Sequence, residues 1–307
     1  DVCSSDLQML PGDEEDSKSG YRSAFSHDNE SASAGYYSVL LDDYDVQAEL
    51  TATARTGFHR YTFPKGAQAN VMIDIKNRDH VLESNIEFIS NTEIQGLRRS
   101  QRWAKNQYVY FYARFSEPFE SFGIAVNDSI FEEIDLAEGK NIRAFVRFNN
   151  PGTVLVKVGI SAVSVEGAKK NLETENPGWD FEQVRKAAAQ DWNGFLSKIE
   201  VEGGTERQRR IFYTGLYHTA IAPNVFMDVD KNYRGVDHQV HHATDHTNYT
   251  TFSLWDTFRA NMPLYSIIDT KRYLDFVKTF LEMYRIGGRL PQWELAGNYT
   301  GVMIGYH

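Results

Sequence analysis

The fold of this chain is decided by the stretch YTTFSLWDTFRANMPLYSIID, residues 249–269. It predicts a short helix, which Thr250 or Thr251 can cap by accepting a hydrogen bond from a free backbone N–H. Pro263 has no N–H with which to continue the hydrogen-bond ladder of a helix. We therefore expect the helix to break or restart at this proline.

The next residues, TKRYLDFVKTFLEMYRIGG (270–288), predict a longer amphipathic helix. Asp269 or Thr270 can cap its start, and Gly287-Gly288 terminates it. Between these ends the apolar residues recur at helical spacing and so share one face. They are Tyr273, Val277, Phe280, Leu281 and Tyr284.

The loop that follows, RLPQWELAGNYTGVMIGYH (289–307), combines aromatic rings with a carboxylate and an amide. The first helix adds Trp255 and Arg259, which are four residues apart and share a face. Such groups suit a sugar, because a sugar offers an apolar C–H face and a rim of hydroxyls. A buried tryptophan pair with satisfied polar partners explains the same residues equally well. The candidate sugar-contacting residues are Trp255, Asp256, Arg259, Trp293, Glu294 and Asn298.

A run of short strands precedes the helices. Its segments are β-branched or aromatic, and they often alternate polar with apolar side chains. Turn residues such as Gly57, Pro64 and Pro151-Gly152 separate them, which predicts an antiparallel sandwich rather than βαβ units. The predicted strands are YYSVLL, DVQAELTATAR, FHRYTF, NVMIDI, SNIEFIS, YVYFYARF, SFGIAVN, IRAFVRF and TVLVKVGIS.

Helical periodicity begins after the strands. DFEQVRKAAAQDWNGFLSKI (180–199) carries an apolar stripe, and Asp180 is its candidate cap. Gly203-Gly204 break the chain, and TERQRRIFYTGLYHTAIAPN (205–224) begins another helix with Thr205 as the candidate cap.

Composition limits the classes of function. The 307 residues suffice for one large domain or two ordinary ones, and 41% hydrophobic residues can build a core. A net charge of −10 with no basic stripe argues against a nucleic-acid partner. Arg98, Arg99 and Arg102 form a small basic cluster before Trp103, which we interpret as a solvated loop. No apolar run approaches the ~20 residues of a membrane span.

The first residues, DVCSSDL (1–7), are what a common sequencing-library adapter encodes when it is read in frame, and we expect them to be non-native. Cys3 is the only cysteine and lies in this segment, so neither a disulfide nor thiol catalysis is predicted. The chain also opens without a signal peptide. If the first residues are an artefact, this says nothing about localisation.

DVDKNYRG (228–235) begins like an EF-hand loop, with Asp228, Asp230 and Asn232 at alternate positions. The loop lacks glycine at its sixth place and glutamate at its twelfth. We therefore predict a turn between two short strands rather than a calcium site.

Four histidines crowd into the next segment: His238, His241, His242 and His246. No cysteine is nearby and the spacing is not HExxH, so the sequence indicates a polar, partly exposed loop rather than a zinc site.

Four motifs resemble those of the family 92 glycoside hydrolases. The resemblance covers nearly the whole chain after about Ser19, and members of that family are calcium-dependent exo-α-mannosidases. The motifs are SLWDTFR (253–259), GGRLPQWELAGNYTGVMIGYH (287–307), FSHDNE (25–30) and GYYSV (35–39).

The resemblance implies a multidomain β + α protein that is truncated at both ends. It places an incomplete antiparallel β-sandwich at residues 1–165, a helical linker at 166–204 and the first part of an (α/α)6 catalytic barrel at 205–307. We expect this fragment to be inactive by itself, because the resemblance places the catalytic acid and base beyond His307.

The implied reaction is inverting hydrolysis that removes terminal mannose from N-glycans or mannans. Such enzymes hold an acid and a base roughly 6.5–9.5 Å apart. Neither a catalytic residue nor a metal ligand is assigned within the chain, because the resemblance places most calcium ligands beyond it as well. Calcium would bind the 2- and 3-hydroxyls of the sugar, a role that suits a hard, oxygen-seeking ion.

The resemblance makes the six candidate residues part of the lining of the sugar pocket. It adds His27 and Asn29 of FSHDNE as substrate-binding residues, although ordinary turn chemistry also explains both. It further implies secretion, to the periplasm or the cell surface of a bacterium. Linkage preference and oligomeric state do not follow from it.

Two other classes of protein fit parts of the sequence. A non-catalytic glycan-binding sandwich requires aromatic residues on one exposed face, yet Tyr108, Tyr110 and Tyr112 alternate as core residues do. Another (α/α)-barrel carbohydrate enzyme, such as a phosphorylase, also pairs a sandwich with a barrel. The motifs WDTFR and GNYTGVMIGYH argue against it.

Overall fold

The computed structural model describes residues 2–3, 20–127 and 129–303. The chain divides into two compact units. The first comprises residues 1–100 and 109–189, and the second comprises 101–108 together with 190–307. The second unit therefore includes a loop that lies more than 80 residues before the rest of the unit in sequence.

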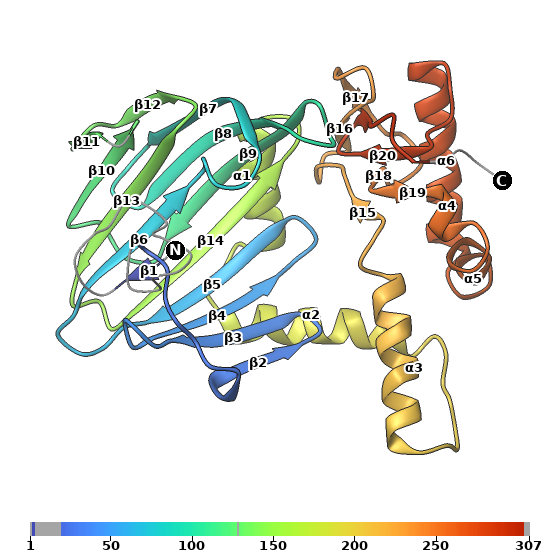
Figure 1. The fold of residues 1–307 in the computed structure, drawn as a ribbon, viewed down its shortest axis with the longest axis horizontal. Coiled ribbons are helices and arrows are strands. Elements are labelled where there is room, and N and C mark those ends of the chain that lie inside the picture. Colours follow the sequence, from blue (N-terminus) through green and yellow to red (C-terminus); the bar gives the residue numbers. More distant parts are fainter. Residues whose placement is uncertain (1, 4–19, 128, 304–307) are drawn as a thin grey trace. The chain divides into compact units, whose positions relative to one another are not determined.

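The first unit is a sandwich of two antiparallel sheets (Figure 1). One sheet has the strand order β1-β6-β13-β10-β11, and the other has the order β12-β7-β8-β9-β14-β5-β4-β3-β2. The strands are β1 (Val2–Cys3), β2 (Glu30–Ser33), β3 (Tyr36–Leu41), β4 (Val46–Ala52), β5 (Thr56–Thr62), β6 (Gln68–Asp74), β7 (His80–Phe88), β8 (Glu93–Gln101), β9 (Gln107–Phe115), β10 (Ser121–Val126), β11 (Ser129–Glu132), β12 (Leu136–Gly139), β13 (Ile142–Asn149) and β14 (Thr153–Ser161).

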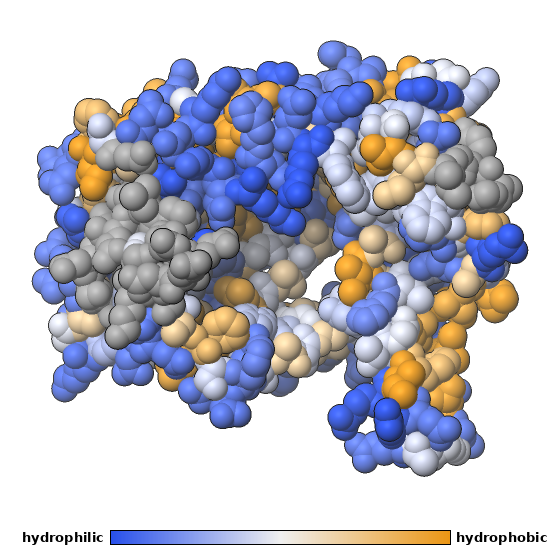
Figure 2. All heavy atoms as spheres, viewed as in Figure 1, coloured by the Kyte–Doolittle hydropathy of each residue, from blue (hydrophilic) through white to orange (hydrophobic). Residues whose placement is uncertain are grey.

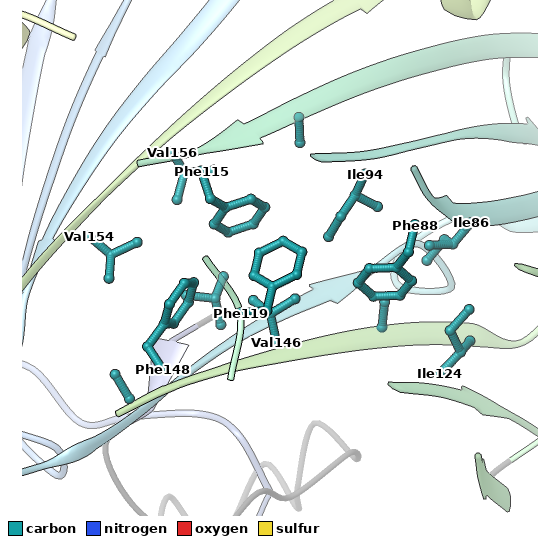
Figure 3. Packing of buried hydrophobic residues seen from close by; sticks show 14 of the residues in the cluster. Ile86, Phe88, Ile94, Phe115, Phe119, Ile124, Val146, Phe148, Val154 and Val156 are labelled. Carbon is teal, nitrogen blue, oxygen red and sulfur yellow. The ribbon is translucent and has the colours of Figure 1, made fainter. Parts of the chain in front are cut away.

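The hydrophobic core of this unit lies between the two sheets (Figure 3). Alternation along the strands turns every second side chain inward, and phenylalanines fill the centre. The rings of Phe115 and Phe119 meet edge to face at 5.1 Å, and Phe119 lies 5.8 Å from Phe148. Each fully buried phenylalanine contributes about 1.5–3 kcal/mol through the hydrophobic effect.

The predicted sandwich is confirmed, and each of the nine predicted segments contains a strand. The interpretation of the basic cluster as a solvated loop is wrong for Arg98 and Arg99, which lie in β8. Strand β8 was not predicted because its sequence, EIQGLRRSQ, is mostly polar. Of the residues predicted to be non-native, 1 and 4–7 lie outside the described residues, and the remaining two form β1.

Helix α1 (Val165–Glu175) packs directly on strand β14. A Cβ added at Gly159 of β14 would stand 2.2 Å from the carbonyl oxygen of Ala168, so the helix and strand backbones are in contact. Tyr112 is buried in the same cluster with Ala168 and Leu172. This aromatic residue therefore belongs to a core rather than to an exposed glycan-binding face.

Lys157 fixes the segment that follows α1. Its ammonium group is buried and donates to the carbonyl oxygens of Asn176, Pro177 and Gly178 at 2.9, 3.2 and 3.0 Å. It also lies 4.2 Å from the centre of the Trp179 ring. Burial lowers the pKa of Lys157 to about 8. Three carbonyl dipoles and an aromatic face thus replace the water that the charge has lost.

The second unit consists of helices and short strands. The short strands form a two-stranded sheet of β15 and β18, another of β16 and β17, and a three-stranded sheet β19-β20-β21. Helix α2 (Phe181–Leu196) begins in the first unit and ends in the second. The other elements are α3 (Glu206–Thr219), β15 (Asn224–Val225), β16 (Asn232–Arg234), β17 (Val240–His242), β18 (Tyr249–Thr250), β19 (Phe252–Ser253), α4 (Leu254–Thr257), α5 (Asn261–Ile268), α6 (Thr270–Gly287), β20 (Trp293–Leu295) and β21 (Asn298–Tyr299).

Most of the predicted helix ends are confirmed. Thr205 forms a capping box with Gln208 at the start of α3, and Asp269 accepts a hydrogen bond from the backbone N–H of Arg272 at the start of α6. Gly288 ends α6 in the left-handed conformation, with φ of 74°.

The predicted caps of the first helix are wrong. Thr250 and Thr251 do not cap it, because Ser253 occupies the N-cap position of α4. The helix also breaks earlier than expected. Helix α4 ends at Thr257, and α5 begins at Asn261 with Pro263 in its first turn, where a proline is tolerated.

The core of the second unit is aromatic. Phe276 of α6 contacts the rings of Tyr249, Phe252 and Tyr265 at 4.8, 5.7 and 5.6 Å. The outer faces of the helices nevertheless carry apolar side chains, and Figure 2 shows hydrophobic groups at the surface over α3 and α5. The exposed apolar residues of these helices and α6 include Ile211, Ile267, Leu274, Leu281 and Tyr284. Leu216, by contrast, is buried.

None of the helices in the described part of the chain is long and apolar enough to cross a membrane.

Candidate functional site

Strand pairing brings two of the sequence motifs together in the second unit. Phe252 pairs with Glu294 and Ser253 pairs with Trp293, so β19 and β20 lie side by side. Strand β19 leads directly into α4, which contains the first three residues of the WDTFR motif, and β20 lies in the PQWEL segment. The two motifs that are about forty residues apart in sequence thus form one structural element.

Glu294 holds this element together from inside. Its side chain is buried, with 1% of the residue exposed, and Thr250 Oγ1 lies 2.9 and 3.0 Å from its two carboxylate oxygens. The backbone N–H groups of Thr251 and Gly297 donate to the carboxylate at 3.1 and 2.7 Å. The Ala296 N–H in turn donates to Thr250 Oγ1 at 2.6 Å. One carboxyl group therefore ties the end of β18 to the turn between β20 and β21.

The electrostatics of Glu294 are unusual for a carboxyl group. Its burial raises the pKa to about 7, because desolvation outweighs the donors that favour the charged form. A cavity of about 10 Å³, roughly the space of one water molecule, is lined by Glu294 together with Asn248 and Gly297. The group is therefore poised to change its charge near neutral pH.

The backbone on both sides of this carboxyl group is strained. Thr251 has φ of 69° and Ala296 has φ of 51°, a left-handed conformation that residues with a Cβ seldom adopt. The hydrogen bonds to Glu294 and Thr250 hold these two residues in place. The resulting kink at Thr251 separates β18 from β19 and so directs the chain into α4.

Asn298 performs a similar task for the loop 101–108. Its side-chain oxygen accepts from the Asn106 N–H at 3.0 Å, and its side-chain nitrogen donates to the carbonyl oxygens of Asn106 at 3.0 Å and Ala296 at 2.8 Å. Asn298 is buried, and these bonds use most of its capacity. Asn298 therefore holds loop 101–108 in place through hydrogen bonds to the backbone of Asn106.

Fixing this loop brings Trp103 to Trp293. The two indole rings meet edge to face, with centres 5.7 Å apart and planes at 83°. Half of Trp103 is exposed (51%), so the pair presents an aromatic edge to solvent. From the sequence, Trp103 was placed after a basic cluster and given no part in the site. Its large aromatic ring in a polar loop is the signal that could have found it, because such rings usually pack against another group.

Helix α4 presents its polar side chains to solvent. Asp256 is exposed and accepts a hydrogen bond of 2.5 Å from the hydroxyl of Ser253. Trp255 is 37% exposed. Arg259 lies in the turn that follows the helix. It is exposed, and its guanidinium lies 4.8 Å from the centre of the Phe258 ring. An indole face, a carboxylate and a guanidinium within five residues are able to stack on a sugar and hydrogen-bond its hydroxyls.

His27 and Asn29 belong to the first unit, in the short 3₁₀ helix η1 (His27–Asn29). The His27 ring is 87% exposed and its Nδ1 lies 2.5 Å from a carboxylate oxygen of Glu30. The structure thus gives both residues a local role in a turn, and their part in sugar binding stays a prediction.

The described residues do not fit a calcium site of their own. Calcium takes six to eight oxygen ligands, and no cluster of three or more histidine, cysteine, aspartate or glutamate residues converges within the described ranges. In the DVDKNYRG stretch Asp230 accepts a hydrogen bond from the Asn232 N–H, as in a turn. Among the four histidines, His241 lies against Asp237 and His242 against Asn232, on a short hairpin.

Comparison with known proteins relates both units to one family. Residues 3–161 match the N-terminal domain of glycosyl hydrolase family 92, and residues 167–307 match the catalytic domain of the same family. A curated relative, an uncharacterized secreted glycosidase of Arthroderma benhamiae, is 24% identical over 226 residues, which are 64% of this chain and 29% of the relative.

Solved structures agree with the sequence comparison. The GH92 α-mannosidase BT3965 from Bacteroides thetaiotaomicron is 34% identical with a TM-score of 0.95 over 100% of this chain, and it has also been solved with mannoimidazole bound. The GH92 inverting mannosidase BT2199 of the same organism is 27% identical, with a TM-score of 0.84 over 92% of this chain. The chain spans 43% and 38% of these two proteins. With its β-sandwich followed by the start of a helical barrel domain, the chain belongs to glycosyl hydrolase family 92.

Proposed function

We propose that the whole protein is an exo-acting α-mannosidase that removes terminal mannose from N-glycans or mannans with inversion at the anomeric carbon. The similarity to the α-mannosidase BT3965 supports the substrate class, and the similarity to the inverting mannosidase BT2199 supports the stereochemistry. The chain spans less than half of either relative, so the activity is proposed for the whole protein.

The observation that best supports the proposal is the pairing of β19 with β20, which places Trp293 beside Ser253 at the start of α4. We assign the exposed residues of this element, Trp255, Asp256 and Arg259, to direct contact with mannose. The carboxylate of Asp256 accepts hydrogen bonds from sugar hydroxyls, and the guanidinium of Arg259 donates to them. Trp293, with Trp103 against it, supplies an apolar wall.

Glu294 and Asn298 contribute to the same pocket from beneath it. Their side chains are buried and hydrogen-bonded to backbone groups, so we assign them to holding the pocket in shape rather than to direct contact with the sugar. Burial raises the pKa of Glu294 to about 7, and its carboxylate faces Thr250 and a water-sized cavity. We place the catalytic acid and base outside residues 1–307 because the resemblance to the family implies it.

Calcium and secretion complete the proposal. We propose that calcium is bound by the whole enzyme, with most of its ligands outside residues 1–307, as the resemblance to the family implies. We also propose export from the cell, to a bacterial periplasm or surface. The secreted glycosidase of Arthroderma benhamiae supports export.

The proposal is tested by assaying the whole protein on mannan and on high-mannose N-glycans. We expect mannose as the product, released first as the β-anomer, which NMR of the early reaction detects. Release of a sugar phosphate in the presence of inorganic phosphate would instead identify a phosphorylase. Binding of mannosides by residues 20–165 without any hydrolysis by the whole protein would identify a glycan-binding module.

A further inference from the structure

The first unit contains a second hollow, which the proposed mannose pocket does not use. It has a volume of about 310 Å³ and lies at the connection between β6 and β7, next to the start of β13. Four cationic side chains line it against two carboxylates, an excess of positive charge in a chain whose net charge is −10. The charged lining residues are Asp74, Lys76, Arg78, Asp79, Lys140 and Arg143, with His80 beside them.

The floor of the hollow is a buried ion pair. Arg143 is 1% exposed, and its Nε lies 3.1 Å from Asp74 Oδ2. The same carboxylate oxygen accepts a hydrogen bond of 2.6 Å from the hydroxyl of Tyr21. The Asp74 charge is thereby balanced inside the protein, because Arg143 neutralises it at contact distance.

The wall of the hollow is a loop that the protein holds rigidly. Asp74 Oδ1 accepts from the backbone N–H groups of Lys76 and Asn77 at 2.8 and 3.0 Å. From the other side Arg98 donates to the carbonyl oxygens of Ile75, Asn77 and Asp79 at 2.8, 3.1 and 3.2 Å. Arg98 thus satisfies three backbone acceptors in one short loop.

This loop holds Arg78 in a strained conformation. Its φ is 90°, in the left-handed region, which residues with a Cβ seldom adopt. A glycine would relieve the strain, yet an arginine with an exposed side chain occupies the position. Within the described residues, neither Arg78 nor its exposed neighbours Lys76 and Lys140 forms an ion pair. Among the described residues, these three exposed side chains therefore have no carboxylate partner that a ligand would have to displace.

We propose that this hollow binds a sugar that carries a phosphate or sulfate group. Three exposed cations around a rigid loop match the charge of a tetrahedral oxyanion, which Arg and Lys bind through charge-assisted hydrogen bonds. The volume exceeds what the anion alone needs and lies at the lower end of the range for small-molecule pockets. The sugar part of this inference rests on the proposed function, whereas the anion part does not.

The test measures binding to the 307-residue chain by calorimetry with four ligands: mannose 6-phosphate, mannose 6-sulfate, neutral mannose and inorganic phosphate. We expect the two charged sugars to bind at this hollow, and neutral mannose not to bind there. Binding should weaken as ionic strength rises. Equal affinity for inorganic phosphate and mannose 6-phosphate would show an adventitious ion only and would overturn the proposal.

Two variants locate the binding. Arg78→Gly removes the charge and also relieves the backbone strain, so the fold is retained while the affinity for mannose 6-phosphate falls at least about tenfold, or about 1.4 kcal/mol. Lys76→Gln combined with Lys140→Gln is expected to do the same. Lys65→Gln, an exposed lysine outside the hollow, is the control and keeps full affinity.

Undiminished binding by Arg78→Gly and by the double lysine variant would also overturn the proposal. Because hydrolysis is not measured, a protein without mannosidase activity still gives a clear result here. Loss of mannosidase activity would therefore count against the proposed function only, and absence of binding at the hollow against this inference only.

Discussion

The hydroxyl of Thr250 lies within hydrogen-bond distance of both carboxylate oxygens of Glu294, at 2.9 and 3.0 Å, in the buried interior of the second unit. The two residues are 44 positions apart in sequence. Their contact fixes the strained kink at Thr251, from which the chain enters α4. The position of the exposed WDTFR residues therefore depends on a pair that solvent does not reach.

The first prediction concerns the dependence of stability on pH. The folded-state pKa of Glu294, about 7, is raised above the ordinary value of 4.5, so folding favours the protonated form. The stability that this group contributes is fully present below about pH 4.5, falls as pH rises to 7 and then stays constant. The loss amounts to about 3 kcal/mol.

This is measured by thermal unfolding of the 307-residue chain at pH 5 and at pH 8. The Glu294→Gln variant cannot titrate, so the difference between the two pH values should shrink. Glu206→Gln changes an exposed glutamate of α3 and serves as the control. The same pH difference in wild type and Glu294→Gln would contradict the prediction.

Removing the hydroxyl of Thr250 should loosen the same element. Thr250→Val keeps the shape but removes one of the three donors to the Glu294 carboxylate and leaves the N–H of Ala296 without its acceptor, at a cost of about 1–3 kcal/mol. Thr250→Ser retains the hydroxyl and should recover most of the stability. The backbone amides of Thr251 and Gly297 should exchange with solvent faster in the valine variant only. Equal exchange in both variants would show that the hydroxyl is not needed.

Asp256→Asn should impair the whole enzyme without unfolding it. The side chain is exposed, so its replacement leaves the packing intact. Losing a charged hydrogen bond to a sugar hydroxyl costs about 1.5–3 kcal/mol, which lowers kcat/KM by about 10- to 150-fold. Ser253→Ala, which removes only the hydrogen bond within the protein, should have a smaller effect. A kcat/KM near that of the wild type for Asp256→Asn would exclude the assignment.

Asn298→Ala should release the loop 101–108. The substitution removes three hydrogen bonds to backbone groups and leaves buried polar atoms unpaired, at a cost of about 1–3 kcal/mol. Limited proteolysis should then cut near Trp103, and the fluorescence of the tryptophan pair should change. Protection of the loop equal to that of the wild type would mean that the ring contact alone holds it.

Calcium removal should abolish hydrolysis by the whole enzyme and leave the melting temperature of the 307-residue chain unchanged. A chelator should abolish hydrolysis by the whole protein, and added calcium should restore it, as the resemblance to the family implies. The melting temperature of the 307-residue chain should be the same in calcium and in chelator, because its described residues bring together no group of three histidine, cysteine, aspartate or glutamate side chains. A calcium-dependent rise in that temperature would reveal a site within the chain.

Much of the fold was predictable because the strands and helices carry strong local signals. β14 alternates as a strand should, and α6 has a cap at Asp269 and a glycine end at Gly288. Strand β8 was not predicted because two consecutive arginines, Arg98 and Arg99, are more typical of an exposed loop. In the structure Arg98 donates hydrogen bonds to carbonyl groups of a turn that is distant in sequence.

The geometry of the candidate site was not predictable from the sequence, and its role in sugar binding stays a prediction. The sequence indicated Trp293, Glu294 and Asn298, yet nothing local indicates that Glu294 bonds to Thr250 or Asn298 to Asn106. These contacts join residues that are 44 and 192 positions apart, and only the tertiary fold determines them. The hydrogen bond between Asn106 and Asn298 ties loop 101–108, and with it Trp103, to the second unit.

The bond between Asn106 and Asn298 also has a consequence for biosynthesis. Loop 101–108 leaves the ribosome 192 residues before its anchor does. At 5–20 residues per second, this is a delay of about 10–40 s. During that time the strands on either side of the loop have their pairing partners within the first unit, while Trp103 has none. The nascent chain therefore exposes Trp103 until Trp293 has been synthesised. Exposed apolar surface on a partly folded chain favours aggregation and is what chaperones bind.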